Sequence, residues 1–302
     1  MSVSPAYAWL PADIQAFIAR TEAAYPPDAV NFTIAQQRAF YDKLCADFAP
    51  PYPPGVRAGN ETLAGVPCRR YTPSAPRAGV TALYFHGGGF VVGGLHSHDS
   101  ICAELAEAAQ LVMIAVDYRL VPEHLHPAAY DDCVAVFDAV PGPKLLVGDS
   151  AGGNLAACVS ATRPGQVLGQ VLIYPGLGGD RALPSYTRHA EAPMLTAADV
   201  DYYARLRFGG ERVKGDLTSA PLDATDYSDL PPTAIFTAQA DPLASDGVEY
   251  AARLAEAGVP VDLTEEPGMV HGYLRARHMA AGARDSFARI ARALAGLAAA
   301  AQ

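Results

Sequence analysis

A serine flanked by glycines is the residue best suited to chemistry in this sequence. Ser150 stands in Gly-Asp-Ser-Ala-Gly-Gly at 148–153, directly after the apolar run at 144–148 and before a helical pattern at 151–162. Gly-x-Ser-x-Gly between a strand and a helix is typical of a nucleophile elbow, in which a tight turn holds the hydroxyl above the strand end. Glycines suit this turn because side chains there would collide with the strand or the helix. The pattern predicts a nucleophile, and an ordinary glycine-rich turn with an incidental serine is the alternative.

A second glycine motif, His-Gly-Gly-Gly at 86–89, follows the β-rich run at 80–85. Backbone N–H groups of such a turn can hold the negative charge that develops on a carbonyl oxygen, because glycines let the main chain approach a ligand closely. A dinucleotide-binding loop is the alternative, since Gly87, Gly89 and Gly93 approach the spacing of that fingerprint. Gly93 is one residue late, and Asp117 at the next strand end lies too far along the chain. We therefore prefer an oxyanion-binding turn.

A serine hydroxyl is a weak nucleophile at neutral pH and needs a general base. In proteins with a nucleophile elbow the base follows the serine in the chain, which leaves His189, His271 and His278. His271 lies in a glycine-bracketed loop after the β-rich run at 261–265, whereas His278 lies in a helical pattern and His189 in an irregular segment. The sequence therefore favours His271 as the base.

The base in turn needs a carboxylate that orients its ring. Asp241 stands just beyond the β-rich run at 233–238, with one helical pattern and one β-rich run between it and His271. Asp246 is the second choice for this role. We predict that Asp241 completes a Ser-Asp-His triad.

These four sites share one position relative to the predicted strands. Each falls just beyond the carboxyl end of a strand, where open parallel sheets bind their ligands. From about residue 79 onward, β-rich runs alternate with helical patterns, which indicates βαβ units and a mainly parallel sheet. The predicted strands cover 80–85, 111–116, 144–148, 170–174, 233–238 and 261–265, and the predicted helices cover 100–109, 128–139, 151–162, 244–257 and 282–300.

Two segments fall outside this alternation. Residues 1–50 contain two predicted amphipathic helices, and residues 178–225 form a Gly- and Pro-punctuated insertion with one helical piece. We predict one α/β catalytic domain, 51–177 and 226–302, covered by a cap of N-terminal helices, 1–50, and an inserted segment, 178–225. The cap supplies large side chains that are candidates for core or for pocket: Trp9, Tyr25, Phe40, Tyr41, Tyr186, Met194, Leu195, Tyr202, Tyr203 and Phe208.

Composition excludes several classes of protein. The chain has 302 residues, of which 50% are hydrophobic and 18% charged, so a folded globular protein is expected. Its formal charge of −10 disfavours binding to nucleic acid and to anionic membranes. No apolar run is long enough for a membrane span and no secretory leader is visible, so a cytoplasmic location is expected.

The sequence predicts neither a disulfide framework nor a metal or other cofactor. The five cysteines are scattered and form no Cys-x-x-Cys pair, which favours reduced and buried thiols. Two His-x-His pairs, His96 with His98 and His124 with His126, lack a third ligand at a convincing spacing, and a serine triad needs no metal.

From about residue 80 to 275, the sequence resembles the bacterial hormone-sensitive-lipase-like esterases of the α/β-hydrolase superfamily. The resemblance rests on HGGG at 86–89, DYRLVPEH at 117–124, HPAAYDD at 126–132, GDSAGGN at 148–154, DPL at 241–243 and HGY at 271–273. It implies an α/β-hydrolase fold, with a mostly parallel central sheet flanked by helices and a helical cap. It also implies cofactor-independent hydrolysis of small carboxylic esters with short acyl chains.

Carried over position by position, the resemblance makes Ser150 the nucleophile, Asp241 the orienting carboxylate and His271 the general base and acid. The resemblance also implies that the backbone N–H groups of Gly88, Gly89 and Ala151 donate to the oxyanion. An amidase, peptidase or lactonase on the same fold remains an alternative, as does a ligand-binding receptor without catalysis. A homodimer is an open alternative to a monomer.

Overall fold

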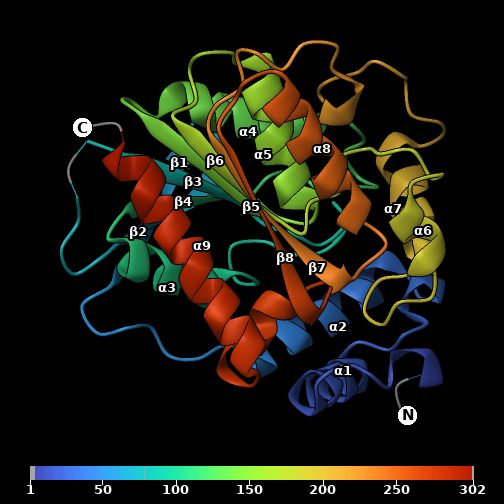
Figure 1. Ribbon diagram of the computed structural model, residues 1–302. Helices are drawn as coiled ribbons and strands as arrows, with labels where there is room; N and C mark the ends of the chain where they lie inside the picture. Colours follow the sequence, from blue (N-terminus) through green and yellow to red (C-terminus); the bar gives the residue numbers. More distant parts are fainter. Residues whose placement is uncertain (1–3, 78, 301–302) are drawn as a thin grey trace.

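A twisted, mostly parallel sheet organises the protein, which we describe from a computed structural model for residues 4–77 and 79–300 (Figure 1). Within this part of the chain the sheet has eight strands in the order β1-β2-β4-β3-β5-β6-β7-β8. Strands β3 to β8 run parallel to one another, whereas β2 is antiparallel to both β1 and β4. The strands are β1 (Arg57–Leu63), β2 (Val66–Thr72), β3 (Thr81–Phe85), β4 (Val112–Val116), β5 (Lys144–Asp149), β6 (Gly169–Ile173), β7 (Thr233–Ala240) and β8 (Val261–Val270).

The six strands predicted from apolar runs are present, and the prediction missed the β1–β2 hairpin. Strand β1 reads RAGNETL and is exposed or half-buried throughout, so it contains no apolar run to recognise. Its turn to β2 is formed by Ala64 and Gly65, both with positive φ, which matches the twist of a two-residue hairpin. The hairpin extends the sheet at the edge away from β5.

Helices cover both faces of the sheet (Figure 1). Helices α4, α5 and α8 pack on one face, and α3 and α9 pack on the other. Side chains alternate between the two faces along a strand, so Ala82 and Tyr84 of β3 join the core under α3 and α9, while Leu83 and Phe85 join the opposite core. The bounds agree with the predicted helices to within a residue at each end: α3 (Asp99–Ala109), α4 (Ala128–Ala139), α5 (Ala151–Thr162), α8 (Ala244–Glu256) and α9 (Ala281–Ala299).

The remaining helices come from the two segments outside the βα alternation. They are α1 (Ala12–Ala24), α2 (Ile34–Asp47), α6 (Pro184–Arg188) and α7 (Ala197–Phe208). Capping boxes begin α2 at Thr33 and α7 at Thr196. The two segments meet where Gln37 of α2 donates to the Tyr202 hydroxyl of α7 at 2.8 Å. The division into a catalytic domain and a two-part cap remains our proposal.

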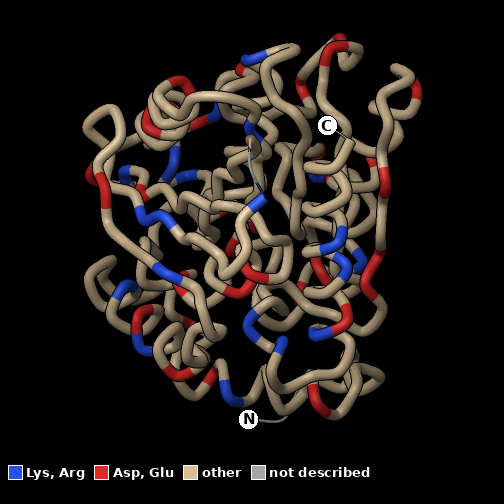
Figure 2. Tube along the Cα trace, turned by 90° about the vertical axis from the view of Figure 1, so that its left-hand side faces the viewer, with Lys and Arg blue, Asp and Glu red and all other residues tan. Residues whose placement is uncertain are grey.

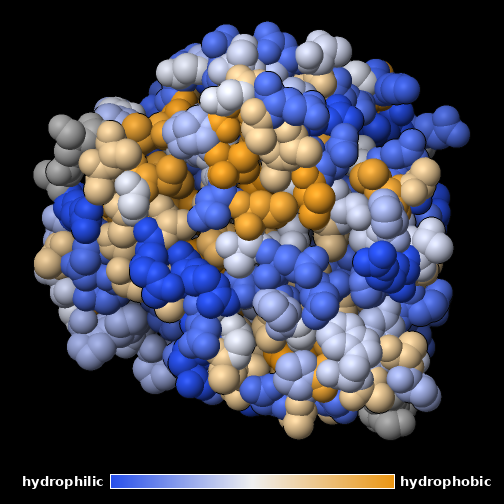
Figure 3. All heavy atoms as spheres, viewed as in Figure 1, coloured by the Kyte–Doolittle hydropathy of each residue, from blue (hydrophilic) through white to orange (hydrophobic). Residues whose placement is uncertain are grey.

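Charged residues are spread over the protein, whereas exposed apolar atoms are more clustered. Acidic and basic positions are interspersed along the trace in Figure 2, with no long stretch of one sign. Figure 3 shows apolar atoms gathered on part of the face that it displays. Exposed large hydrophobic side chains include Val248 of α8 and Leu263 of β8. None of the described helices is long and apolar enough to cross a membrane.

Candidate active site

The turn between β5 and α5 holds Ser150 in strained backbone geometry. Its φ is 53° and its ψ is −116°, a conformation that residues with a side chain rarely adopt. A Cβ on Gly152 would lie 1.9 Å from the Phe85 carbonyl oxygen, and one on Gly148 would lie 2.3 Å from the backbone of Gly152. Both glycines are therefore required by close backbone packing.

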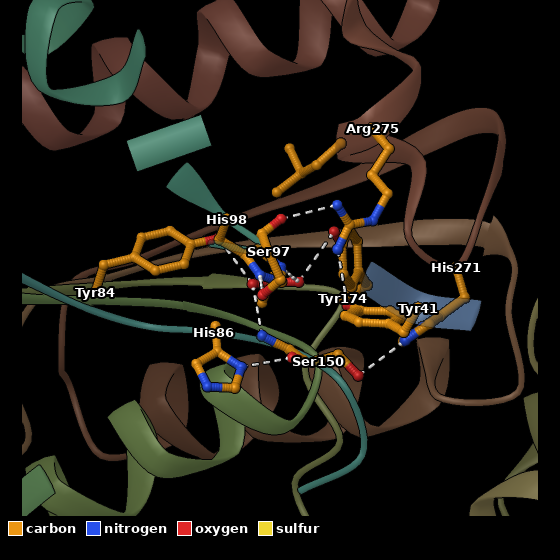
Figure 4. Close-up of polar contacts among 12 residues, drawn as sticks. Tyr41, Tyr84, His86, Ser97, His98, Ser150, Tyr174, His271 and Arg275 are labelled. Atoms are coloured by element: carbon orange, nitrogen blue, oxygen red, sulfur yellow. Dashed lines mark hydrogen bonds and ion pairs between the residues drawn. The ribbon is translucent and has the colours of Figure 1, made fainter. Parts of the chain in front are cut away.

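Ser150, His271 and Asp241 form a chain of short polar contacts. His271 Nε2 lies 2.9 Å from Ser150 Oγ, and His271 Nδ1 lies 2.7 Å from Asp241 Oδ2. Figure 4 shows the Ser150 and His271 side chains pointing toward one another. Asp241 is fully buried, and its Oδ1 accepts a hydrogen bond from the Leu243 N–H at 2.8 Å. With a proton on Nδ1 donated to Asp241, Nε2 is free to accept the proton of the Ser150 hydroxyl.

The strands explain why residues so far apart in sequence meet. Ser150, Asp241 and His271 directly follow β5, β7 and β8, which belong to a run of adjacent parallel strands. Their carboxyl ends therefore lie along one edge of the sheet.

The other candidates for base and acid have separate partners. His278 Nε2 lies 2.9 Å from Glu104, and His189 Nδ1 lies 3.4 Å from the Tyr7 hydroxyl. Asp246 accepts hydrogen bonds from the N–H groups of Leu177 and Gly179 and from the Tyr186 hydroxyl. Burial raises the pKa of Asp246, and its three donors tie the start of the inserted segment to α8.

The three N–H groups expected to bind an oxyanion are available. Those of Gly88, Gly89 and Ala151 donate no hydrogen bond to any residue in the part of the chain that the structure describes. Gly88 and Gly89 have φ values of 125° and 60°, and a Cβ on Gly88 would lie 2.1 Å from the Val92 carbonyl oxygen. The loop is therefore one that only glycine can form, and Ala151 adds the N-terminus of α5 beside it.

His86 supports this loop from behind. Its Nδ1 lies 2.8 Å from the Gly87 carbonyl oxygen, and its ring stacks on Tyr118 with centroids 4.2 Å apart. Burial lowers the pKa of His86 to about 3, so the ring is neutral at physiological pH. This position fits a structural role in the glycine loop.

Sequence reasoning missed Asp149, the residue before the nucleophile. Its Oδ1 accepts hydrogen bonds from the Tyr84 hydroxyl at 2.7 Å and from the Gly87 N–H at 3.0 Å, and its Oδ2 lies 3.3 Å from His98 Nε2. Burial by itself would raise its pKa, but His98, Tyr84 and the charge of Arg275 outweigh burial and hold the pKa below its usual range. The sequence does place this acidic residue directly after the apolar run at 144–148, which could have indicated a buried carboxylate.

Arg275 belongs to the same network and was also missed. It donates to the Ser97 carbonyl oxygen at 3.0 Å and to the Tyr41 hydroxyl of α2 at 2.7 Å (Figure 4). Ser97 precedes His98, which contacts Asp149. The network thus connects a helix of the N-terminal segment to the turn that carries Ser150.

A cavity of about 570 Å³ lies above Ser150 and His271. Gly88, Gly89 and Ala151 line it beside them. Of the cap candidates, Trp9, Phe40 and Tyr202 are not among its lining residues. Those that do line it are Tyr25, Tyr41, Tyr186, Met194, Leu195, Tyr203 and Phe208.

Three histidines of the two His-x-His pairs lie near carboxylates. His96, His98 and His126 each lie near a separate carboxylate, on Asp42, Asp149 and Asp216 respectively. No group of three His, Cys, Asp or Glu residues suited to a metal occurs in the described ranges. All five cysteines are free and buried, so the predicted burial of the thiols is confirmed.

Comparison with known proteins shows the family of the chain. The family described as alpha/beta hydrolase fold matches residues 82–275. The carboxylesterase NlhH of Mycobacterium tuberculosis is 40% identical over 236 residues, which cover 72% of this chain and 73% of that protein. An ethyl acetate hydrolase of Pseudomonas putida is 34% identical over 228 residues, which cover 70% of this chain and 72% of that protein.

Similarity to solved structures covers nearly the whole chain. The crystal structure of an esterase from the bacterial hormone-sensitive lipase family has a TM-score of 0.85 and 25% identity, covering 98% of this chain and 99% of that one. The chain belongs to the α/β-hydrolase family. Within it, the relatives define a carboxylic ester hydrolase of the bacterial hormone-sensitive-lipase-like type.

Proposed function

We propose that this enzyme hydrolyses short-chain carboxylic esters by a two-step acyl transfer through Ser150, His271 and Asp241. The observation that carries the proposal is the chain of contacts at 2.9 Å and 2.7 Å that joins these residues at the wall of the cavity. A hydroxyl, a base and an oriented carboxylate in this order are the parts that serine acyl transfer needs.

In the first step, Ser150 Oγ attacks the ester carbonyl carbon while its proton passes to His271 Nε2. The imidazolium that forms is stabilised by the Asp241 carboxylate, and the oxyanion accepts hydrogen bonds from the N–H groups of Gly88, Gly89 and Ala151. The tetrahedral intermediate collapses, and the alcohol leaves with the proton from Nε2. Water, deprotonated by His271, then attacks the acyl-enzyme and releases the acid and the free serine.

The preference for short acyl chains has two supports. The cavity of about 570 Å³ must hold both the acid and the alcohol parts of the substrate, and helices from both cap segments contribute to its walls. One relative carries the name ethyl acetate hydrolase, and ethyl acetate is an ester of a two-carbon acid. We further propose a reducing compartment such as the cytoplasm, because all five cysteines are unpaired.

The central test is the rate of hydrolysis of p-nitrophenyl esters from acetate to dodecanoate. We expect kcat/KM to be highest for the shorter acyl chains and Ser150→Ala to lose several powers of ten in kcat, because the triad acts as a unit. Near wild-type turnover by Ser150→Ala would overturn the mechanism, and a maximum at dodecanoate would overturn the chain-length preference.

Two further assays separate the alternatives. A fluorophosphonate should label wild-type protein at Ser150, because only an activated hydroxyl reacts rapidly, and it should not label Ser150→Ala. Absence of labelling would favour a ligand-binding receptor. Anilides matched to the esters in acyl chain should be cleaved far more slowly, whereas equal rates would favour an amidase.

A further inference from the structure

The cavity wall contains a buried arginine that the proposed mechanism does not use. Arg207 stands in the last turn of α7, and only 6% of its surface is exposed. Its guanidinium lies over the Phe90 ring, 3.8 Å from the centroid. Nη1 donates to Asn154 Oδ1 at 3.0 Å and to the Ser219 carbonyl oxygen at 3.3 Å.

The charge of Arg207 has no close counter-charge. No carboxylate of the described residues lies within ion-pair distance of it, and Asp216, whose charge acts on it from further away, contacts His126. Nη2 of Arg207 is buried without a hydrogen-bond partner in the same part of the chain. Burial lowers the pKa of Arg207 to about 10, so the group still carries its charge at neutral pH. A buried cation in this state is unfavourable unless a partner arrives.

The arginine lies close to the reacting centre. Its partner Asn154 stands one helical turn after Ser150, which is roughly 6 Å along α5. Tyr203, one turn before Arg207 on α7, packs so tightly on the glycine loop that a Cβ on Gly89 would lie 2.6 Å from its ring. Arg207 therefore lines the cavity where α7 meets α5, on the helix whose Tyr203 packs on the glycine loop.

Four polar residues of the cavity wall lie close together around this arginine, and we call them the arginine subsite: Asn154, Arg207, Arg212 and Ser219. Arg212 is paired with Asp223. Arg207 is therefore the cation of this group that has no carboxylate partner among the described residues.

We propose that the arginine subsite binds a carboxylate carried by the ester substrate, so that the enzyme prefers esters bearing a second, ionised acid group. The inference rests on ester hydrolysis at Ser150. A carboxylate would bring the counter-charge that Arg207 lacks, and guanidinium groups are suited to carboxylates because their donors match both oxygens. Because Asn154, which contacts Arg207, lies roughly 6 Å along α5 from Ser150, we test first a carboxylate separated from the ester carbonyl by a short methylene linker.

The carboxylate can belong to the acid part or to the alcohol part of the ester, and two pairs of substrates distinguish these sources. Monomethyl glutarate carries the charge on the acid part, and methyl valerate is its neutral match. γ-Acetoxybutyrate carries the charge on the alcohol part, and butyl acetate is its neutral match. Acid release in a pH-stat gives kcat/KM for all four.

We expect wild-type enzyme to favour one charged ester over its neutral match by roughly 10- to 100-fold, the range of a charge-assisted hydrogen bond. Arg207→Met should abolish this ratio while it changes hydrolysis of the neutral ester much less. Arg207→Lys should keep part of the ratio because it keeps the charge. Arg205→Met is the matched control, since Arg205 is an exposed arginine of the same helix. Its ratio should equal that of wild type.

Arg207 also joins α7 to α5 through Asn154, so a purely structural role must be separable. Equal losses for charged and neutral esters in Arg207→Met would overturn the subsite and leave a structural arginine. If that variant does not fold, wild-type enzyme still decides: faster hydrolysis of both neutral esters than of their charged matches overturns the subsite alone. Failure to hydrolyse any of the four esters would overturn the proposed function, and the subsite with it.

Discussion

Replacing Asp149 with Asn tests whether the residue before the nucleophile positions the glycine loop. Asp149 is 4% exposed. Its carboxylate accepts hydrogen bonds from Tyr84, Gly87 and His98 at 2.7, 3.0 and 3.3 Å. Asparagine has the same shape, so no cavity forms. Its amide nitrogen, however, takes the place of Oδ2 and faces His98 Nε2, from which it cannot accept a hydrogen bond. The negative charge is also lost.

The expected loss of stability follows from these contacts. A hydrogen bond to a charged group contributes about 1.5–3 kcal/mol. The amide oxygen can keep Tyr84 and Gly87, while the contact with His98 and the charge near Arg275 are lost. We therefore expect the free energy of unfolding to fall by about 3 kcal/mol at pH 7, toward the lower end of the range for breaking buried charged contacts.

The pH dependence gives a second, independent readout. The pKa of Asp149 in the folded protein lies below its ordinary value. Its carboxylate therefore stabilises the folded state above pH about 4, and this contribution is lost as the pH falls further. The difference in stability between wild type and Asp149→Asn should accordingly shrink in acid.

Urea unfolding followed by circular dichroism measures stability, and p-nitrophenyl butyrate measures turnover. We expect kcat of Asp149→Asn to fall at least about tenfold with a smaller change in KM, because an uncharged acceptor holds the Gly87 N–H less firmly and a small shift of Gly87 moves the N–H donors beside it. Asp138→Asn is the control, since Asp138 forms an exposed pair with Arg163 whose loss should change stability by less than about 1 kcal/mol. Stability within about 1 kcal/mol of wild type, together with unchanged kcat, would refute the role of Asp149.

Three other predictions test the site and its surroundings. Gly152→Ala should fail to accumulate as folded protein or unfold at much lower urea, because its Cβ would lie 1.9 Å from the Phe85 carbonyl oxygen; a wild-type unfolding curve would contradict this. Asp241→Asn should keep the circular dichroism spectrum and lose roughly three to four powers of ten in kcat, because His271 is no longer held in the required tautomer. Unchanged turnover would instead point to Asp246. A thiol reagent should react with native protein far more slowly than with unfolded protein, since all five cysteines are buried.

The parallel part of the sheet and the helices that flank it could be predicted because each has a local signature. Strands β3 to β7 are nearly all buried, so each appears as a short apolar run, and the helices between them are separated by turns. The edge hairpin has no such signature. Strand β1 has a mostly exposed, polar sequence, and its place in the sheet is set by pairing with β2 rather than by its own pattern.

The candidate triad was predictable because the fold converts strand ends into neighbours. Motifs that follow β5, β7 and β8 must meet at one edge once these strands run parallel in the same part of the sheet. Asp149 was not predictable in the same way, since its partners Tyr84, Gly87 and His98 come from elements whose side-chain directions the sequence does not specify.

The arginines of α7 show where sequence reasoning ends. Arg205 and Arg207 stand two residues apart in a helix without a clear apolar stripe, and the sequence offers no reason to bury one rather than the other. Packing decides, because the face of α7 that carries Tyr203 and Arg207 lies against the glycine loop and α5. Arg205 thereby stays in solvent, while Arg207 becomes a charge beside the nucleophile. Substrate selectivity on the arginine subsite would thus be determined by how α7 packs on α5 and the glycine loop, which the sequence motifs do not specify.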